Sequence, residues 1–136
     1  QDEFSIKWET NAELTVCNIN VDKDLLKRAI SNLIQNSISH NENGCTIYVS
    51  VAANNNNCII CVEDNGIGVS DEKIEKLNHE PHYMICDTST AEQRHGLGLL
   101  IVQQIIGAHN GTVDISRSKY GGFKVELTVP SKKCGL

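Results

Sequence analysis

The sequence predicts an α+β fold, a two-layer α/β sandwich in which about three helices cover one face of a mixed, mostly antiparallel sheet of about five strands. Two observations favour this class. Segments with strand alternation and segments with helical period follow one another in the order strands, helix, strands, loop, helix, strands. No internal repeat or linker divides the 136 residues, so we expect a single domain over 1–136.

The first half of the chain contains two expected strands and a long helix. Residues 4–8 and 14–19 alternate apolar and polar side chains, as half-buried strands do. Asp22 offers an N-cap for a helix that continues to His40. The apolar stripe of this helix has spacings of three and four residues and consists of Leu26, Ala29, Ile30, Leu33 and Ser37.

The middle of the chain changes from a strand pattern to an irregular one. Residues 45–52 and 58–63 are predicted to be strands, and the asparagines between them form a polar hairpin loop. From Val69 to Arg94 the periodicity is lost, except for a short helix expected at Asp71 to Leu77.

Helical period returns in the last third of the chain. It predicts a helix over Leu97 to Ala108 that ends at Asn110-Gly111, a typical C-cap. His109 is then expected at the carboxyl end of this helix, where the helix dipole favours a cation. Residues 112–118 and 123–129 are predicted to form a final pair of strands.

Composition excludes several classes of function. The formal net charge is −5 and no basic stripe offsets it, so nucleic acid is not expected as a partner. No apolar run approaches the roughly 18 residues of a spanning helix, and we expect a cytoplasmic domain without direct membrane contact. Six cysteines are present, but the close pair Cys58 and Cys61 lies on a strand that sends positions three apart to opposite faces. Core thiols are therefore favoured over zinc ligands.

A narrow polar stripe borders the apolar face of the first helix. Asn32, Asn36 and His40 advance by only about 40° per step, given about 100° per residue. Amides at the rim of a core can reach into a cleft, where a carboxamide oxygen suits Mg²⁺. The alternative is that both asparagines are surface or capping amides.

A glycine-rich turn follows the strand 58–63, with the sequence Asp64-Asn65-Gly66-Ile67-Gly68. Glycines on both sides of Ile67 allow the backbone to approach a flat ligand closely, and Asp64 could accept a hydrogen bond from an exocyclic amine. A simple hairpin turn is the alternative, although the residues after Gly68 indicate a loop and a helix start instead of a partner strand.

A second glycine pair, Gly96-Leu97-Gly98-Leu99, is predicted to open the helix that ends at Ala108. Free N–H groups and the positive end of the helix dipole could bind a phosphate there. The segment lacks the full dinucleotide-binding fingerprint, and the chain contains no Walker phosphate loop.

Together these segments resemble the catalytic ATP-binding domain of sensor histidine kinases, in the ATPase group that also contains gyrase, the Hsp90 chaperones and MutL. Residues 32–37 resemble the asparagine box of that family, residues 64–68 its first glycine box and residues 96–99 its second. The resemblance covers nearly the whole chain and continues over residues 101–112, after the second glycine box.

The resemblance implies roles for individual residues. Asn36 would coordinate the Mg²⁺ that bridges the phosphates of ATP, and Asp64 would bind the adenine amine. Gly66, Ile67 and Gly68 would border the adenine pocket. Residues of about 69–95 would be an ATP lid. Gly96 and Gly98 would allow this lid to close on the phosphates, and backbone amides near Leu97 and Leu99 would donate hydrogen bonds to them.

Positions 39 and 40 depart partly from the family pattern. The family often has a lysine followed by an aromatic residue or histidine after the asparagine box, and here Ser39 replaces the lysine while His40 fits. Arg94 or His95, beside the second glycine box, is the expected substitute for the missing cation.

Asn32 distinguishes between the hydrolase and histidine kinase branches of this ATPase group. Gyrase-like hydrolases have a glutamate general base four residues before the metal asparagine, and Asn32 cannot take a proton. The sequence therefore predicts transfer of the γ-phosphate to a histidine on a separate dimerisation domain, expected to be absent from this chain, with a response regulator as an indirect partner. A non-catalytic nucleotide-responsive binding module is the alternative, and a gyrase-like hydrolase is the third.

Overall fold

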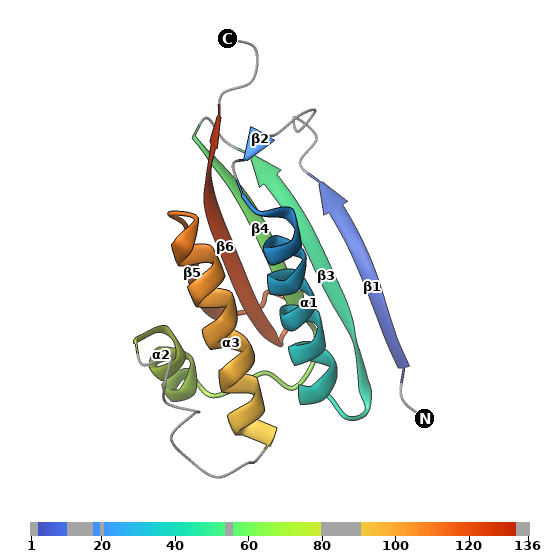
Figure 1. The fold of residues 1–136 in the computed structure, drawn as a ribbon. Helices are drawn as coiled ribbons and strands as arrows, with labels where there is room; N and C mark the ends of the chain where they lie inside the picture. Colours follow the sequence, from blue (N-terminus) through green and yellow to red (C-terminus); the bar gives the residue numbers. More distant parts are fainter. Residues whose placement is uncertain (1–2, 11–17, 20, 54–55, 80–90, 133–136) are drawn as a thin grey trace.

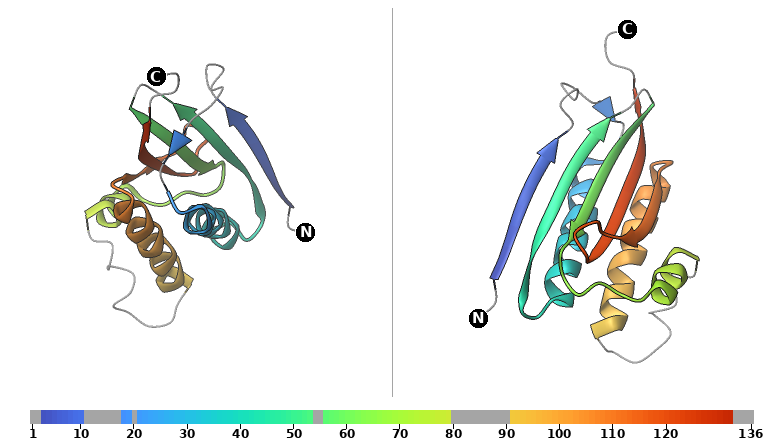
Figure 2. Two further views of the ribbon diagram at one scale, coloured as in Figure 1. Left: turned by 45° about the horizontal axis from the view of Figure 1, so that its top comes forward. Right: turned by 180° about the vertical axis from the view of Figure 1, so that it is seen from behind.

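The structure is a computed structural model that describes residues 3–10, 18–19, 21–53, 56–79 and 91–132. It has two layers, a sheet and a set of helices on one of its faces (Figure 1). From behind, the strands lie in front of the long helices α1 and α3 (Figure 2). The predicted α+β sandwich is confirmed.

The sheet contains five strands of six to ten residues among the described residues, in the order β1-β3-β4-β6-β5. The pair β1–β3 is parallel and the other pairs are antiparallel. A two-residue strand, β2, pairs with the end of β6. The bounds are β1 Glu3–Thr10, β2 Asn18–Ile19, β3 Gly44–Ala53, β4 Asn57–Asp64, β5 Thr112–Arg117 and β6 Phe123–Lys132.

Three helices are described: α1 Lys23–His40, α2 Asp71–His79 and α3 Ala91–Ala108. The α1 prediction is confirmed at both ends. The Asp22 carboxylate caps α1 by accepting the N–H groups of Asp24 and Leu25 at 2.9 and 3.1 Å. The stripe of α1 packs with α3 on the inner face of the sheet, around a core of Ala29, Leu33, Ile47, Val49, Val62, Val102, Ile106 and Leu127.

The start of α3 differs from the prediction. The helix begins at Ala91, so the segment 96–99 lies inside it and does not open it. The residues from Ala91 to Arg94 are all strong helix formers, but they contain no apolar stripe that a periodicity search could detect. Of the predicted lid, residues 80–90 lie outside the described residues, as does most of the predicted strand 14–19.

His109 joins α3 to the start of α1. Its Nδ1 lies 2.7 Å from the carbonyl oxygen of Ile105, and its Nε2 accepts the N–H of Asp22 at 3.0 Å. The expected position of His109 at the carboxyl end of α3 is confirmed, and both ring nitrogens contact backbone groups there.

Replacing His109 with alanine should lower the free energy of unfolding by about 1–2 kcal/mol, because one hydrogen bond between the ends of α3 and α1 and one within the end of α3 are lost. Urea denaturation followed by circular dichroism measures this change. His79→Ala, at the exposed end of α2, is the matched control and should change stability by less than about 0.5 kcal/mol. Equal stability of the wild type and His109→Ala would contradict the role of the ring.

Candidate functional site

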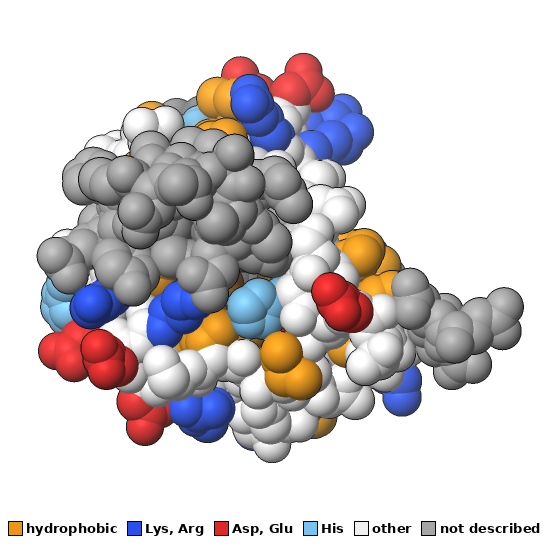
Figure 3. Space-filling view, turned by 90° about the horizontal axis from the view of Figure 1, so that it is seen from below, with side chains coloured by type: hydrophobic (Ala, Val, Ile, Leu, Met, Phe, Trp, Pro, Cys, Tyr) orange, Lys and Arg blue, Asp and Glu red, His pale blue; other side chains and the backbone are white. Residues whose placement is uncertain are grey.

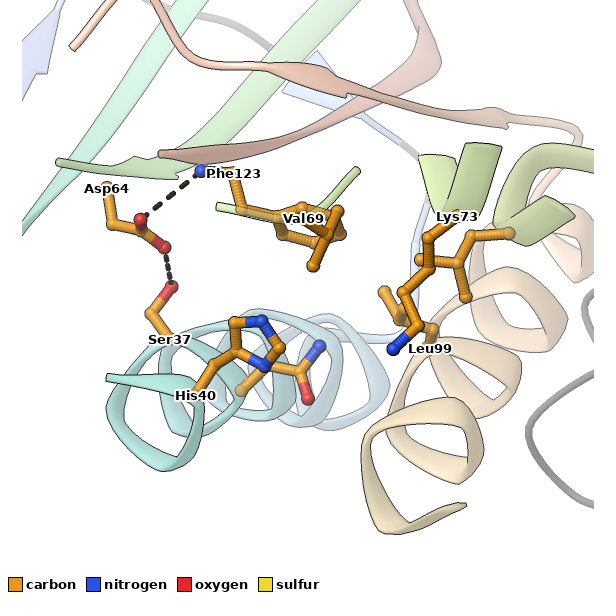
Figure 4. Close-up of a pocket in the computed structure, with 9 residues that line it drawn as sticks. Ser37, His40, Asp64, Val69, Lys73, Leu99 and Phe123 are labelled. Atoms are coloured by element: carbon orange, nitrogen blue, oxygen red, sulfur yellow. Dashed lines mark hydrogen bonds between the residues drawn. The ribbon is translucent and has the colours of Figure 1, made fainter. Parts of the chain in front are cut away.

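A cleft opens where the end of α1, the loop after β4, α2, α3 and the start of β6 meet (Figure 4). The empty space between its walls, including the part open to solvent, is about 390 Å³. The cleft brings together four residues predicted from the sequence, Asn36, His40, Asp64 and Leu99. The other lining residues were not named individually as site residues: Ser37 lies in the predicted asparagine box, Val69, Lys73 and Leu77 lie in the predicted lid, and Phe123 lies outside both.

Asp64 is the buried polar centre of one wall, with 1% of its surface exposed. Its Oδ2 accepts the hydroxyl of Ser37 at 2.9 Å, on the buried stripe of α1. Its Oδ1 accepts the N–H groups of Gly66 at 2.9 Å and Phe123 at 3.2 Å. These three donors offset the cost of burying the carboxylate and fix its orientation.

Two glycines are required by this arrangement. A Cβ on Gly122 would overlap the Asp64 carboxylate, so the β5–β6 turn can approach the carboxylate only with glycine at this position. Gly68 has φ of +69°, the left-handed region in which side chains are strained. The approach of the first glycine box to a flat ligand stays a prediction, and the need for glycine at position 122 was not predicted.

The turn at Gly122 is also held from the opposite face of the sheet. Glu63 is buried there and accepts the hydroxyl of Ser118 at 2.6 Å. The ring of Tyr120 stacks on Tyr48 with a centroid distance of 3.8 Å. Consecutive residues of β4, Glu63 and Asp64, therefore fix the same turn from both faces.

Asn41 connects α1 to the first glycine box, and the sequence analysis missed it. Its Nδ2 donates to the carbonyl oxygen of Ser37 at 2.8 Å, and its Oδ1 accepts the N–H of Ile67 at 3.0 Å. Gly66 packs against the same amide, where a Cβ would overlap it. The available signal was an asparagine directly after a helical segment, a common cap.

Not every predicted site residue reaches the cleft. The side chain of Ile67 is 78% exposed, although its backbone is held by Asn41. Ser39 is exposed and its hydroxyl accepts the side chain amide of Gln35 at 3.2 Å. Asn32 is half-buried, and its Nδ2 has no hydrogen-bond partner in the described structure.

Residues 94–99 lie within α3, so the helix determines where they stand relative to the cleft. Gly98 faces Asn36, since a Cβ on Gly98 would lie 3.8 Å from Asn36 Oδ1, and Leu99 is buried in the cleft wall. The side chains of Arg94 and His95 lie outside the described part. Gly96 and Leu97 lie beyond the first four residues of the helix, whose N–H groups are the ones a helix leaves unpaired.

Two sets of side-chain hydrogen bonds fix helix α2 to the edge strand β5. The Asn78 amide pairs with the backbone of Ile115, donating to its carbonyl at 2.8 Å and accepting its N–H at 2.9 Å. Arg117 donates to Asp71 at 2.6 Å and to the Val69 carbonyl at 3.1 Å. These contacts hold the side of α2 that contains Lys73 and Leu77 against the cleft.

An open hollow adjoins the cleft on the outer side of the first glycine box. It shares His40, Val69 and Lys73 with the cleft and adds Ile67, Gly68, Ser70, Glu72 and Lys76. Figure 3 views this end of the molecule, where basic and histidine side chains lie close together.

Two of the described thiols, Cys45 and Cys61, have raised pKa values. Burial and the neighbouring Glu63 carboxylate raise the pKa of Cys61 to about 12, and burial raises the pKa of Cys45. A thiol must lose its proton to bind a metal strongly. In the described part of the chain no group of three His, Cys, Asp or Glu side chains could hold a metal ion.

Comparison with known families gives one match over most of the chain. Residues 21–133 match the model of the histidine kinase-, DNA gyrase B- and HSP90-like ATPases. Sporulation kinase B of Bacillus subtilis is 32% identical over 128 residues, which are 93% of this chain and 28% of that protein. The signal transduction histidine-protein kinase BaeS of Escherichia coli is 28% identical over 82% of this chain and 24% of its own length. The chain thus spans about a quarter of these relatives.

Solved structures agree in fold. The mycobacterial sensor histidine kinase MprB has a TM-score of 0.69 at 19% identity, over 97% of this chain and 83% of that one. The catalytic domain of histidine kinase ThkA has a TM-score of 0.72 at 21% identity, over 95% and 81%. Within the described residues, no helix has the length and apolar character needed to cross a membrane. The relatives that this chain matches include histidine kinases, and the chain belongs to the family of histidine kinase-, DNA gyrase B- and HSP90-like ATPases.

Proposed function

We propose that this domain binds Mg-ATP in the cleft and donates the γ-phosphate to a histidine on a separate dimerisation domain. The observation that supports ATP best is the Asp64 carboxylate at the wall of a largely apolar cleft. A carboxylate has about four acceptor sites, and Asp64 uses three of them within the protein. The remaining site suits the exocyclic amine of adenine, while Val69, Leu77 and Phe123 suit the faces and edges of a flat base.

The amides of α1 fit a magnesium nucleotide. Asn36 contributes a carboxamide oxygen at a point where Gly98 leaves space, and Mg²⁺ usually takes one or two protein oxygens together with phosphates and water. The unpartnered Nδ2 of Asn32, one turn earlier, is a donor that a phosphate oxygen or a metal-bound water would satisfy. Bound Mg²⁺ would supply charge neutralisation of the phosphates.

The acidic groups of the cleft bear on which group receives the γ-phosphate. Among the described residues that line it, Asp64 is the one carboxylate, and three hydrogen bonds occupy it. A free carboxylate base of the kind that gyrase-like hydrolases use is therefore missing from this set, and Asn32 cannot act as one. This favours a nucleophile that is reactive by itself, such as a histidine imidazole. We place the reaction in the cytoplasm, with a response regulator receiving the phosphoryl group afterwards.

A transfer assay tests the proposal. The chain is mixed with ATP labelled at the γ-phosphate and with the isolated dimerisation domain of a histidine kinase of this family. We expect acid-labile, base-stable label on the histidine of that domain, which identifies phosphohistidine. Tight ATP binding without transfer would instead support a nucleotide-responsive module, which the outward position of Ser39 favours. Rapid release of phosphate by the chain alone would indicate a hydrolase.

A further inference from the structure

The cleft has opposite chemical character at its two sides. Asp64 and Ser37 lie at one side, and the ammonium group of Lys73 extends from α2 towards Leu99 at the other (Figure 4). A nucleotide has the same polarity, with a hydrogen-bonding base at one end and several negative charges at the other. Among the described residues that line the cleft, Lys73 is the one with a permanent positive charge.

The position of Lys73 is built into the fold. The hydroxyl of Ser70 accepts the N–H of Lys73 at 3.2 Å and its carbonyl accepts the N–H of Ile74 at 3.0 Å, which fixes the first turn of α2. Arg117 of β5 binds Asp71 at the start of the helix, and Asn78 pairs with Ile115 of β5 near its end. The lysine therefore enters the cleft from a helix held at both ends.

Lys73 also connects the cleft to the neighbouring hollow. Both are lined by Lys73 and His40, whereas Lys76, one turn further along α2, lines the hollow alone. Lys76 lies 4.0 Å from Glu72, the carboxylate one turn before it. Two lysines of one helix thus differ in their access to the cleft, which provides a matched comparison.

We propose that Lys73 contacts the phosphates of the bound nucleotide, supplying from α2 the cation that α1 lacks at Ser39. This inference rests on the proposed function. Ser39 is exposed and bonded to Gln35, so it lies away from the cleft. An ammonium group paired with phosphate oxygens in a partly buried cleft forms a charge-assisted hydrogen bond, which binds phosphate but is indifferent to the base.

Binding of Mg-ATP and of adenosine to the Lys73→Ala variant tests this inference. We expect the Kd for Mg-ATP to rise about tenfold, the effect of one charge-assisted hydrogen bond, and the Kd for adenosine to change less than about twofold. Lys73→Arg should recover most of the Mg-ATP affinity because it restores the charge. Lys76→Ala removes the same charge from the same helix and should change either Kd by less than about twofold.

Each other result has a defined meaning. If the wild-type chain binds neither Mg-ATP nor adenosine, the proposed function fails and this inference fails with it. If the wild type binds Mg-ATP and Lys73→Ala binds it equally well, only the role of Lys73 is overturned. If Lys73→Ala loses affinity for Mg-ATP and for adenosine equally, Lys73 shapes the pocket and does not contact the phosphates. If Lys73→Ala and Lys76→Ala lose the same Mg-ATP affinity, the effect comes from the overall charge of α2. Both of these results overturn the inference.

Discussion

Replacing Asp64 with asparagine should abolish the preference for ATP over GTP and weaken ATP binding on the order of a hundredfold. The carboxylate accepts from Ser37, Gly66 and Phe123, and its remaining acceptor site is the one we assign to adenine. An amide turns one of the two oxygens into a donor. That donor would face either the protein donors or the adenine amine, while it could pair with the carbonyl of guanine. Titration with ATP and GTP in the presence of Mg²⁺ measures both effects.

Two further variants separate base recognition from folding. Asp114→Asn makes the same charge change at an exposed position of β5 and should leave the ratio of ATP to GTP affinity unchanged. Ser37→Ala removes one of the three donors but keeps the carboxylate, so ATP binding should weaken less than about tenfold with the preference for adenine retained. An unchanged ratio in a folded Asp64→Asn variant would remove Asp64 from base recognition.

The sequence predicted those parts of the fold that depend on local signals. The cap at Asp22 and the stripe containing Ala29 and Leu33 lie within α1 itself, and both ends of that helix were predicted. The start of α3 was missed because its first turns, at 91–94, have helix propensity without an apolar stripe. The parallel pairing of β1 with β3 joins residues about forty positions apart, which no local pattern reports.

The candidate site shows the same division. Asn36, His40, Asp64 and Leu99 were selected as members of short motifs, and the structure brings all four to one cleft. The side chain amide of Asn41, the main-chain N–H of Phe123 and the ammonium of Lys73 were missed. Two of them act on partners distant in sequence: Asn41 accepts from Ile67, 26 positions away, and the Phe123 donor is 59 positions from Asp64. A backbone donor leaves no trace in residue type, so only the folded chain identifies it.

The second large effect is expected from Asn36→Ala, which should reduce phosphoryl transfer at least about a hundredfold while adenosine binding changes little. Asn36 lies on the cleft wall facing Gly98, and in the proposed function its oxygen is the protein ligand of Mg²⁺. Adenosine has no phosphate and needs no metal, so its affinity depends on Asp64 and the apolar walls. The transfer assay, the Kd of ATP with and without Mg²⁺ and the Kd of adenosine distinguish the loss of the metal ligand from a loss of base binding.

Gln35→Ala is the matched control for that variant, because Gln35 is an exposed amide at the preceding position of α1 and donates a hydrogen bond to Ser39. It should retain both transfer and the Mg²⁺ dependence of ATP binding. A loss of adenosine affinity in Asn36→Ala would show that the amide shapes the base pocket. Retained Mg²⁺ dependence would assign the metal to other oxygens. Selective loss of Mg²⁺ dependence would instead place the phosphates between Asn36 on α1 and Lys73 on α2, across the cleft from the base at Asp64.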